Sequence, residues 1–358
     1  MQHPTYHAYR EAWAKAYTID PPVPLNVDIE LASVCNLACP FCFWGEADFN
    51  QDMKQILPDG KPKKRLMPTE MALRIIDECA KIGVPALKFN WRGESTIHPE
   101  YSKILQYARQ QYSVKCGHAG SPHRGREIVN NAGGVGPQDL ECAFEDIRPA
   151  FHDLLVNTNA NCKDSAINGL MAATKVMVSL DSTIPEIYAK MRVNGNLERA
   201  IEVIKELIRR GHPNLWVRRV ITKDNAHEPF AQNVHNILGG KGYKVSEHHC
   251  VDRSTDSTHQ TNNPDSYERT YCGYPSQRLM VASDGTCYPC CVDYDGTMQM
   301  GRFPEQALVE IWNGAPFQNL RRELRANQFK SEACKKCTSW MAYKAPQRNQ
   351  VQDKEVKV

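Results

Sequence analysis

The sequence lacks the marks of a secreted or membrane-embedded protein. None of its apolar runs approaches the length needed to span a membrane, and residues 1–20 are polar, without the apolar core of a signal peptide. The formal net charge is only +3, which indicates no broad surface for nucleic acid or lipid. We therefore expect a cytoplasmic protein without a membrane or nucleic-acid partner, while a nucleotide or modified base stays open as a substrate.

Cysteine, by contrast, is abundant. The chain has 14 cysteines, and without a secretion signal these favour a reducing compartment and metal binding over disulfides. Cys35, Cys39 and Cys42 share one loop at C-x3-C-x2-C spacing, directly after an alternating, strand-like stretch at residues 26–31. Three thiolates can hold three irons of a [4Fe–4S] cube and leave the fourth open to a small chelating molecule. Zinc prefers paired ligands in a closed tetrahedron, so an isolated triple of cysteines at this spacing suits zinc poorly.

A strand–helix alternation begins at this loop. Strands are expected at residues 26–31, 86–90, 154–157, 175–180, 215–221 and 244–247, with amphipathic helices between them. Six such units predict an α/β fold with a parallel sheet, open or curled. The functional site of such a sheet lies at the carboxyl ends of its strands, where the cysteine loop is already found.

Two segments interrupt this alternation. Residues 45–66 form a polar, lysine-rich loop, and residues 113–150 form a glycine-rich insertion. Because long structured loops tend to be functional, we expect the insertion to face the substrate or to contact another subunit. A metal site is the alternative, since the insertion contains Cys116, His118, His123 and Cys142.

A second cysteine group follows a polar, turn-rich stretch at residues 252–270. Asp284-Gly285 between two strand-like runs predicts a β-hairpin over residues 279–288. Short helices are expected around residues 307–312 and 317–325. The cysteines of this region are Cys272, Cys287, Cys290, Cys291, Cys334 and Cys337.

The first cysteine loop, with Phe41 just before its last cysteine, resembles that of the radical S-adenosylmethionine (radical SAM) enzymes. The resemblance implies a partial (β/α)6 barrel, with Cys35, Cys39 and Cys42 holding a [4Fe–4S] cluster. It also implies that the amine and carboxylate of SAM chelate the open iron. Reduction of the cluster then cleaves SAM to a 5′-deoxyadenosyl radical, which takes hydrogen from an unactivated carbon.

Further stretches look like the SAM-binding motifs of that family. Trp91-Arg92-Gly93-Glu94 resembles its Gly-Gly-Glu motif, with Arg92 in place of the first glycine, so Gly93 and Glu94 are expected at the SAM ammonium. Resemblance assigns Ser179 and Arg192 to the ribose and carboxylate of SAM, and a guanidinium suits a carboxylate physically. Arg192 as a solvated surface charge is the alternative. The motif around Asn159 matches the family too, although asparagine is also a common turn residue.

The C-terminal region resembles the auxiliary-cluster domains called SPASM or, in shortened form, Twitch. Twitch, with one auxiliary cluster, is the better match, because no cysteine follows Cys337. The resemblance implies a second [4Fe–4S] cluster on Cys272, Cys290, Cys334 and Cys337, and a structural zinc on the same residues is the rival. We predict an N-terminal extension at residues 1–24, the barrel at 25–250 with insertions at 45–66 and 113–150, the auxiliary domain at 251–340 and a charged tail at 341–358.

The resemblance implies an oxidoreductase or an isomerase or epimerase that acts on a small polar substrate such as a sugar, cyclitol or nucleotide. The auxiliary cluster would accept an electron, or a spare thiol among Cys250, Cys287 and Cys291 would return a hydrogen atom. An electron donor such as flavodoxin or ferredoxin is implied as a partner. The alternatives are modification of a peptide, for which residues 1–24 are too short to form a winged-helix peptide-binding domain, and a non-catalytic two-cluster electron carrier.

Overall fold

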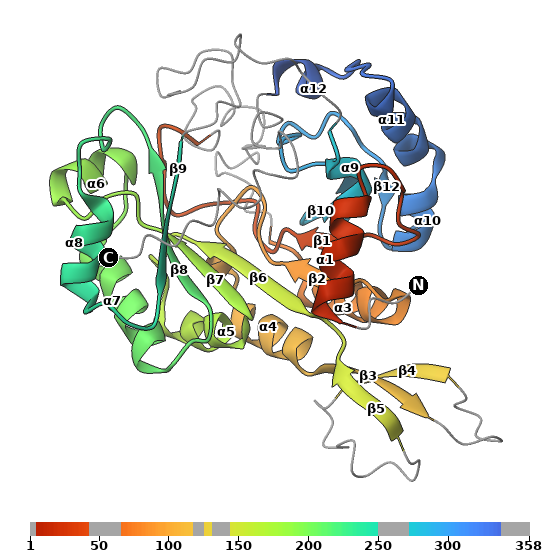
Figure 1. Cartoon of the computed structure of the whole chain (residues 1–358), viewed down its shortest axis with the longest axis horizontal. Helices are drawn as coiled ribbons and strands as arrows, with labels where there is room; N and C mark the ends of the chain where they lie inside the picture. The colour runs from red at the N-terminus through yellow and green to blue at the C-terminus, as the bar shows by residue number, and fades with distance from the viewer. Residues whose placement is uncertain (1–4, 43–65, 117–124, 131–143, 250–271, 338–358) are drawn as a thin grey trace, which may run out of the picture.

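The computed structural model describes residues 5–42, 66–116, 125–130, 144–249 and 272–337 (Figure 1). Its main element is a nine-stranded sheet in the order β12-β11-β10-β1-β2-β6-β7-β8-β9. The strands from β1 to β9 in this order run parallel to one another. Their bounds are β1 Asn26–Ile29, β2 Ala86–Lys88, β6 Asp153–Thr158, β7 Lys175–Ser179, β8 Leu215–Ile221 and β9 Lys244–His249. All six predicted strands are therefore confirmed.

Helices cover one face of this sheet. They are α3 Thr69–Ile82, α4 Tyr101–Arg109, α5 Ile167–Ala172, α6 Pro185–Met191, α7 Leu197–Arg209 and α8 Phe230–Leu238, with 3₁₀ turns at Ser95–Ile97 and Asp164–Ala166. Helix α1 (Tyr6–Lys15) packs on the opposite face, where Tyr9 and Ala16 form a small cluster with Ala86. In α7, Asn196 caps the amino end and Val203, Ile204 and Leu207 are fully buried. Burial of each such side chain stabilises the folded state by about 1.5–3 kcal/mol.

The inner face of the sheet is more polar. Val176 and Val178 of β7 belong to the helix-covered core, so Lys175, Met177 and Ser179 point to the opposite face. The registers of β6, β8 and β9 continue this alternation across the sheet. The inward-pointing side chains at the carboxyl ends of these strands therefore lie at the same edge of the sheet as the start of the cysteine loop.

The predicted C-terminal hairpin is present, and it extends the barrel sheet. Strand β10 (Arg278–Val281) pairs parallel to β1, while β11 (Thr286–Tyr288) and β12 (Gly301–Arg302) continue antiparallel. Helices α9 Tyr274–Gln277, α10 Leu308–Asn313, α11 Ala315–Arg325 and α12 Glu332–Lys336 lie beside this end of the sheet (Figure 1). The two regions thus share one sheet, because the edge of β1 needs a hydrogen-bonded partner.

The 113–150 insertion contains a second, three-stranded sheet. Strands β3 Gln111–Cys116, β4 Gly125–Asn130 and β5 Phe144–Pro149 are ordered β4-β3-β5 and project from the body (Figure 1). The insertion lies between the end of α4 and the start of β6, at the amino edge of the main sheet. It is therefore on the side opposite the cysteine loop, which disfavours a substrate-facing role. His118, His123 and Cys142 lie outside the described residues.

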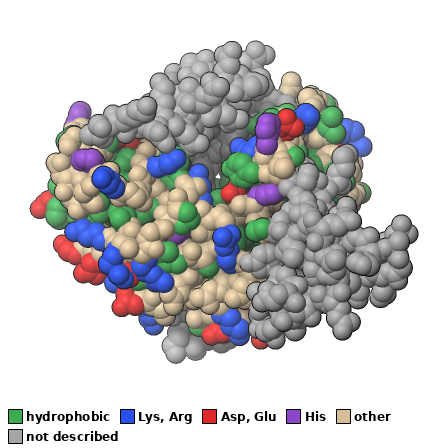
Figure 2. Space-filling model, turned by 60° about the horizontal axis from the view of Figure 1, so that its bottom comes forward, with side chains coloured by type: hydrophobic (Ala, Val, Ile, Leu, Met, Phe, Trp, Pro, Cys, Tyr) green, Lys and Arg blue, Asp and Glu red, His purple; other side chains and the backbone are tan. Residues whose placement is uncertain are grey.

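The described surface carries mixed charge. Basic and acidic side chains are interspersed on the face shown in Figure 2, and the large hydrophobic side chains exposed among the described residues are Tyr6, Ile19 and Val193. None of the described helices combines the length and apolar character needed to cross a bilayer.

Candidate active site and auxiliary centre

The first cysteine loop begins just beyond the carboxyl end of β1. Cys39 is buried, while Cys35 and Cys42 are partly exposed. The Cys42 N–H donates to the Cys39 carbonyl (3.0 Å), and the Leu37 N–H points at Cys35 Sγ (3.4 Å). Backbone N–H groups directed at cysteine sulfurs are one of the means by which proteins tune iron–sulfur clusters.

Burial keeps the thiols of Cys35 and Cys39 protonated in the absence of a metal. It raises the pKa of Cys35 to about 12, and the Glu94 carboxylate adds to the rise. Burial also raises the pKa of Cys39, against the opposing effect of Arg192. Metal ligands must be deprotonated, so binding of iron releases these protons. The donor set, three thiols with N–H groups nearby, fits a [4Fe–4S] cluster.

Glu94 is the centre of the strand-end motif. It is buried, and its Oε1 accepts from the Thr96 N–H (3.2 Å) and hydroxyl (2.7 Å) and from the Thr158 hydroxyl (2.9 Å). Its Oε2 accepts from the Asn159 N–H (2.8 Å). The carboxylate is thus held between the ends of β2 and β6, next to the cysteine loop. This geometry agrees with its predicted position near the SAM ammonium.

Gly93 is required by close packing against the same loop. A Cβ atom at this position would lie 2.3 Å from the carbonyl oxygens of Ala32 and Val34. The neighbouring Glu94 N–H donates to the Val34 carbonyl (2.9 Å). The motif and the cysteine loop are therefore joined backbone to backbone, which only glycine permits.

Arg192, just past the end of α6, packs against the cysteine loop with only 11% of its side chain exposed. Its Nη2 forms an ion pair with Asp181 (2.5 Å), its Nη1 donates to Cys39 Sγ (3.5 Å), and the guanidinium lies 5.5 Å from the Phe41 ring centroid. Burial alone would lower the pKa of Arg192, but Asp181 and Cys39 outweigh it, and the pKa is raised. The surface-charge interpretation is therefore wrong.

One donor of Arg192 remains to be satisfied. Its Nε is buried without a hydrogen-bond partner among the described residues. Leaving a buried guanidinium N–H unpaired costs free energy. A carboxylate approaching the open iron beside Cys39 fits this donor, and SAM carries such a carboxylate.

The remaining residues predicted to bind SAM lie at the same end of the sheet. Asn159 donates through Nδ2 to Asn36 Oδ1 (2.9 Å) and lies 3.8 Å from Cys35 Sγ, so its side chain supports the cysteine loop as well as forming a turn. Ser179 ends β7 on the inner face, paired in register with Arg218. The structure thus brings Phe41 and the predicted SAM residues to one end of the sheet.

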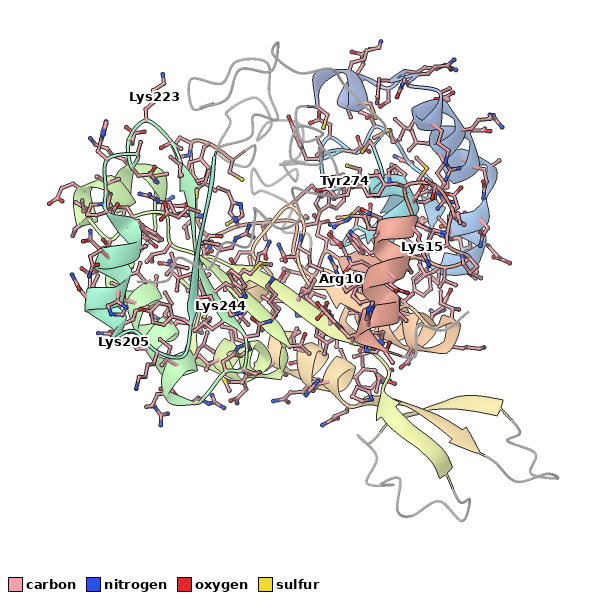
Figure 3. All side chains as sticks on the ribbon, in the orientation of Figure 1. Arg10, Lys15, Lys205, Lys223, Lys244 and Tyr274 are labelled. Atoms are coloured by element: carbon pink, nitrogen blue, oxygen red, sulfur yellow. The ribbon has the colours of Figure 1, made fainter. Side chains whose placement is uncertain are left out.

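The second cysteine group surrounds a hollow of about 470 Å³, a figure that includes open solvent at its mouth. Tyr274, whose position Figure 3 marks, is part of its lining. The cysteines that line it are Cys272, Cys290, Cys334 and Cys337. These are the four predicted ligands.

The spacing of these thiols suits a cluster. Cys334 lies in α12 and Cys337 is the residue just past its end, and both line the hollow. Among the described residues, no three His, Cys, Asp or Glu side chains come as close together as the ligands of one metal ion do. A cubane separates its four ligands farther than a zinc ion does, so the hollow fits the cluster better than the rival zinc.

Cys290 and Cys291 are adjacent in the sequence. Adjacent side chains of an extended segment point to opposite sides, but here Cys291 begins a turn. The two thiols are hydrogen-bonded, which is the largest cause of the raised pKa of Cys290. Cys290 lines the hollow and receives the Val292 N–H at its sulfur (3.3 Å), so it remains the predicted ligand.

Of the three thiols considered as hydrogen donors, Cys287 is contradicted by its position and Cys250 is not described by the structure. Cys287 is fully buried in the helix-covered core, and its thiol donates to the Gly285 carbonyl (3.6 Å). It has no access to a substrate, so we no longer consider it a hydrogen donor. Cys250 lies outside the described residues. Cys291 remains the candidate and packs beside Trp91 and Tyr288.

Several residues of this site had no role assigned to them from the sequence. Asp181 and Thr96 orient Arg192 and Glu94, and Glu30 forms a buried ion pair with Arg92 (2.7 Å). Glu30 could have been found from the sequence, because its carboxylate lies between apolar residues of a strand-like stretch. A charge buried in such a place is almost always paired.

Two family models match the chain. The model described as the radical SAM superfamily matches residues 29–237. The SPASM model, described as an iron–sulfur cluster-binding domain, matches residues 272–338. The first matched region runs from the end of β1 into α8 and contains the first cysteine loop, and the second contains the second cysteine group.

Curated relatives are similar over most of the chain. The "PqqA peptide cyclase" of Xanthomonas campestris pv. campestris is 23% identical over 331 residues, which cover 88% of this chain and 80% of the relative. The "S-adenosyl-L-methionine-dependent 2-deoxy-scyllo-inosamine dehydrogenase" of Niallia circulans is 33% identical over 69 residues, 19% of this chain and 28% of the relative.

Solved structures share the fold. Streptococcus suis SuiB bound to the precursor peptide SuiA has a TM-score of 0.57 at 14% identity, covering 98% of this chain and 77% of SuiB. BtrN in complex with AdoMet and 2-DOIA has a TM-score of 0.50 at 13% identity, covering 89% and 94% of the two chains. The family and domain imply SAM, a [4Fe–4S] cluster and an auxiliary iron–sulfur cluster as cofactors, as predicted. The chain belongs to the radical SAM superfamily and carries a C-terminal SPASM domain.

Proposed function

We propose that the protein abstracts hydrogen from a carbon of a small polar substrate and completes a net oxidation or an epimerisation. SAM and the clusters, when bound, supply the 5′-deoxyadenosyl radical and the electron transfer. Cys35, Cys39 and Cys42 hold the first cluster, while Glu94 and Arg192 orient the amine and carboxylate of SAM. Cys272, Cys290, Cys334 and Cys337 hold the auxiliary cluster. Flavodoxin or ferredoxin as electron donor and a cytoplasmic location stay predictions.

The polar inner face of the sheet carries this proposal. The carboxyl-terminal halves of β6 to β9 present Asn157, Ser179, Arg218, Ser246 and His248 inward. Asn157 Oδ1 and Ser246 Oγ are buried without a hydrogen-bond partner among the described residues. Such atoms favour a ligand with hydroxyl or amine groups.

Cationic side chains strengthen the polar character of this face. Arg218 Nη2 donates to His248 Nε2 (2.5 Å). Closer to the amino ends, Lys175 and Lys244 lie 4.7 and 5.2 Å from the Trp216 ring centroid; Figure 3 marks Lys244. The lining thus suits a hydroxylated or anionic molecule better than an apolar one.

Peptide modification is the second candidate. It is favoured by similarity to "PqqA peptide cyclase" over 88% of this chain and by the shared fold of SuiB, solved with its precursor peptide. In that case the same Glu94 and Arg192 bind SAM, and a peptide side chain reaches the inner face.

Deuterium transfer tests the two candidates directly. The reconstituted, reduced enzyme is incubated with SAM and carbon-deuterated compounds, namely aminocyclitols, sugars, nucleotides and short peptides. We expect deuterium in 5′-deoxyadenosine from one of the small polar classes. Transfer from peptides alone would favour the second candidate, and 5′-deoxyadenosine without deuterium from any class would contradict the first.

A further inference from the structure

Side chains outside the SAM-binding contacts join the strand-end motif to the loop that carries Cys290. We propose that Trp91, Arg92 and Glu30 are positioning residues that hold residues 289–294 against the SAM site and thereby fix the auxiliary centre. This inference rests on the proposed auxiliary cluster and assigns its geometry to residues of the barrel.

Arg92 and Glu30 form the buried part of this link. Arg92 Nε and Nη2 donate to the two oxygens of Glu30 (2.7 and 2.8 Å), and the Glu30 side chain is fully buried while that of Arg92 is 4% exposed. The pair reaches the C-terminal region twice, because Arg92 Nη1 donates to the Tyr294 carbonyl (3.3 Å) and the Ser283 N–H donates to Glu30 (3.1 Å).

Arg92 replaces a glycine of the motif that this stretch resembles. A glycine could form none of these side-chain contacts. A lysine would make a single point contact in place of the planar, bidentate fork. Of these three residue types, only arginine at position 92 can contact both oxygens of Glu30 and the Tyr294 carbonyl together.

Trp91 holds the same loop by a second contact. Its Nε1 donates to the Cys291 carbonyl (2.9 Å), its ring packs 5.2 Å from that of Tyr288, and Arg92 stacks 4.1 Å from the Trp91 ring centroid. The bond to Cys291 lies one residue beyond Cys290. It thus fixes the backbone that directs the Cys290 thiol into the hollow.

The other end of the link is rigid. Trp91 and Arg92 directly precede Gly93 and Glu94, which are bound to the backbone of the first cysteine loop at Val34. The two cysteine groups are therefore connected through four consecutive residues and their contacts. Because hydrogen bonds and solvent exposure around the sulfurs set the reduction potential of a cluster, loosening this link should alter the auxiliary cluster alone.

The test uses Trp91→Phe, which keeps an aromatic ring and removes the N–H, and the paired variant Glu30→Gln/Arg92→Gln. The pair avoids leaving one buried charge uncompensated, which could prevent folding. Each reconstituted protein is challenged with an iron chelator, and each cluster is followed by its own EPR signal and reduction potential. We expect the auxiliary cluster to be lost about fivefold faster in Trp91→Phe, the factor for one hydrogen bond, and its potential to shift. The SAM-bound cluster should be unchanged.

Trp312→Phe is the matched control. Trp312 Nε1 also donates to a backbone carbonyl, that of Pro21 (2.8 Å), away from the loop, so its loss should change neither cluster. Wild-type loss rates and potentials in both test variants would overturn the inference, as would equal effects on both clusters. A wild-type protein that holds about four irons would overturn the proposed auxiliary cluster together with the inference.

Discussion

At the scale of single residues, the proposed SAM site is preorganised by its own chain. Four hydrogen bonds from Thr96, Thr158 and Asn159 fix the Glu94 carboxylate. Asp181 and Cys39 fix Arg192 on the other side of the loop. A ligand with one ammonium and one carboxylate therefore meets groups that are already oriented, which reduces the entropy lost on binding.

Glu94→Ala should weaken SAM binding while the first cluster stays in place. The substitution removes the anionic group and leaves the buried Asn159 N–H and Thr158 hydroxyl without an acceptor, at about 1–3 kcal/mol each. We expect the Kd for SAM, measured by calorimetry on the reconstituted protein, to rise on the order of tenfold or more. Glu206→Ala, at an exposed ion pair of α7, is the control. Unchanged affinity in Glu94→Ala would mean that this motif does not bind SAM.

Cys290 and Cys291 should differ in iron binding although their thiols touch. Cys290 lines the hollow and Cys291 does not. Cys290→Ala should lower the iron content from about eight to about four per chain, whereas Cys291→Ala should keep about eight. Iron and sulfide analysis checks both. The assignment is reversed if Cys291→Ala loses the cluster and Cys290→Ala does not.

Cys291→Ala also separates the two reaction types. Continued SAM cleavage and hydrogen abstraction with loss of the final product would identify Cys291 as a hydrogen donor in a redox-neutral reaction. Full activity would make Cys291 a packing residue and favour oxidation through the auxiliary cluster.

At the scale of elements, β-strand ends and loops are joined by contacts that leave no space for larger side chains. Gly93→Ala places a Cβ against two backbone carbonyls, which cannot move as easily as a side chain. We expect a loss of about 1–3 kcal/mol in stability and weaker SAM binding. Thermal unfolding and calorimetry check these outcomes.

Gly211→Ala is the control for this substitution. Gly211 has a positive φ of 72°, but no atom lies within 4 Å of the position that an alanine methyl group would take. Alanine there should therefore cost about 1–2 kcal/mol of backbone strain and leave SAM binding intact. Equal SAM affinities of Gly93→Ala and wild type would show that the motif and the loop can separate without consequence.

Cys287 makes a prediction about pH. Burial within the core raises the pKa of its thiol to about 12. Below pH 9 the thiol is protonated in both the folded and the unfolded chain, so it does not make the free energy of unfolding depend on pH. Between pH 9 and 12 the unfolded chain loses this proton and the folded chain keeps it, so stability falls as pH rises, by on the order of 1 kcal/mol per unit.

Anaerobic urea unfolding at pH 8, 9 and 10 measures this contribution. The Cys287→Ala variant should show a shallower decline above pH 9 than the wild type, because the other titrating groups are common to both proteins. Parallel declines would contradict the buried, protonated state of Cys287.

Local pattern predicted most of the elements. Alternating apolar residues in β7 and the amphipathic face of α7 are properties of short segments, so both were predicted from the sequence. The sheet of the insertion was missed because glycine-rich, polar residues there carry no clear period. Among site residues, cysteine spacing and strand-end motifs were informative, whereas Asp181 and Glu30 depend on partners far away in the sequence.

At the scale of the whole molecule, the barrel and the SPASM region form one continuous structure. Strand β10 pairs with β1 over four residues, and the buried Asp28 carboxylate lies 3.4 Å from Lys88 and 3.6 Å from Arg278. One charge thus joins β1, β2 and β10. The sequence predicted the hairpin but not its partner, because strand pairing between distant segments is a property of tertiary structure. The domain boundary predicted near residue 250 does not separate two sheets.

Reductive cleavage of SAM tests the central claim most directly. The anaerobically reconstituted protein, with its iron content determined, is reduced with dithionite in the presence of SAM, and 5′-deoxyadenosine is measured by chromatography. We predict about eight irons per chain and release of 5′-deoxyadenosine, with none formed by Cys39→Ala. A protein that holds both clusters and binds SAM, yet releases no 5′-deoxyadenosine on reduction, would contradict the account and leave the two-cluster electron carrier as the better description.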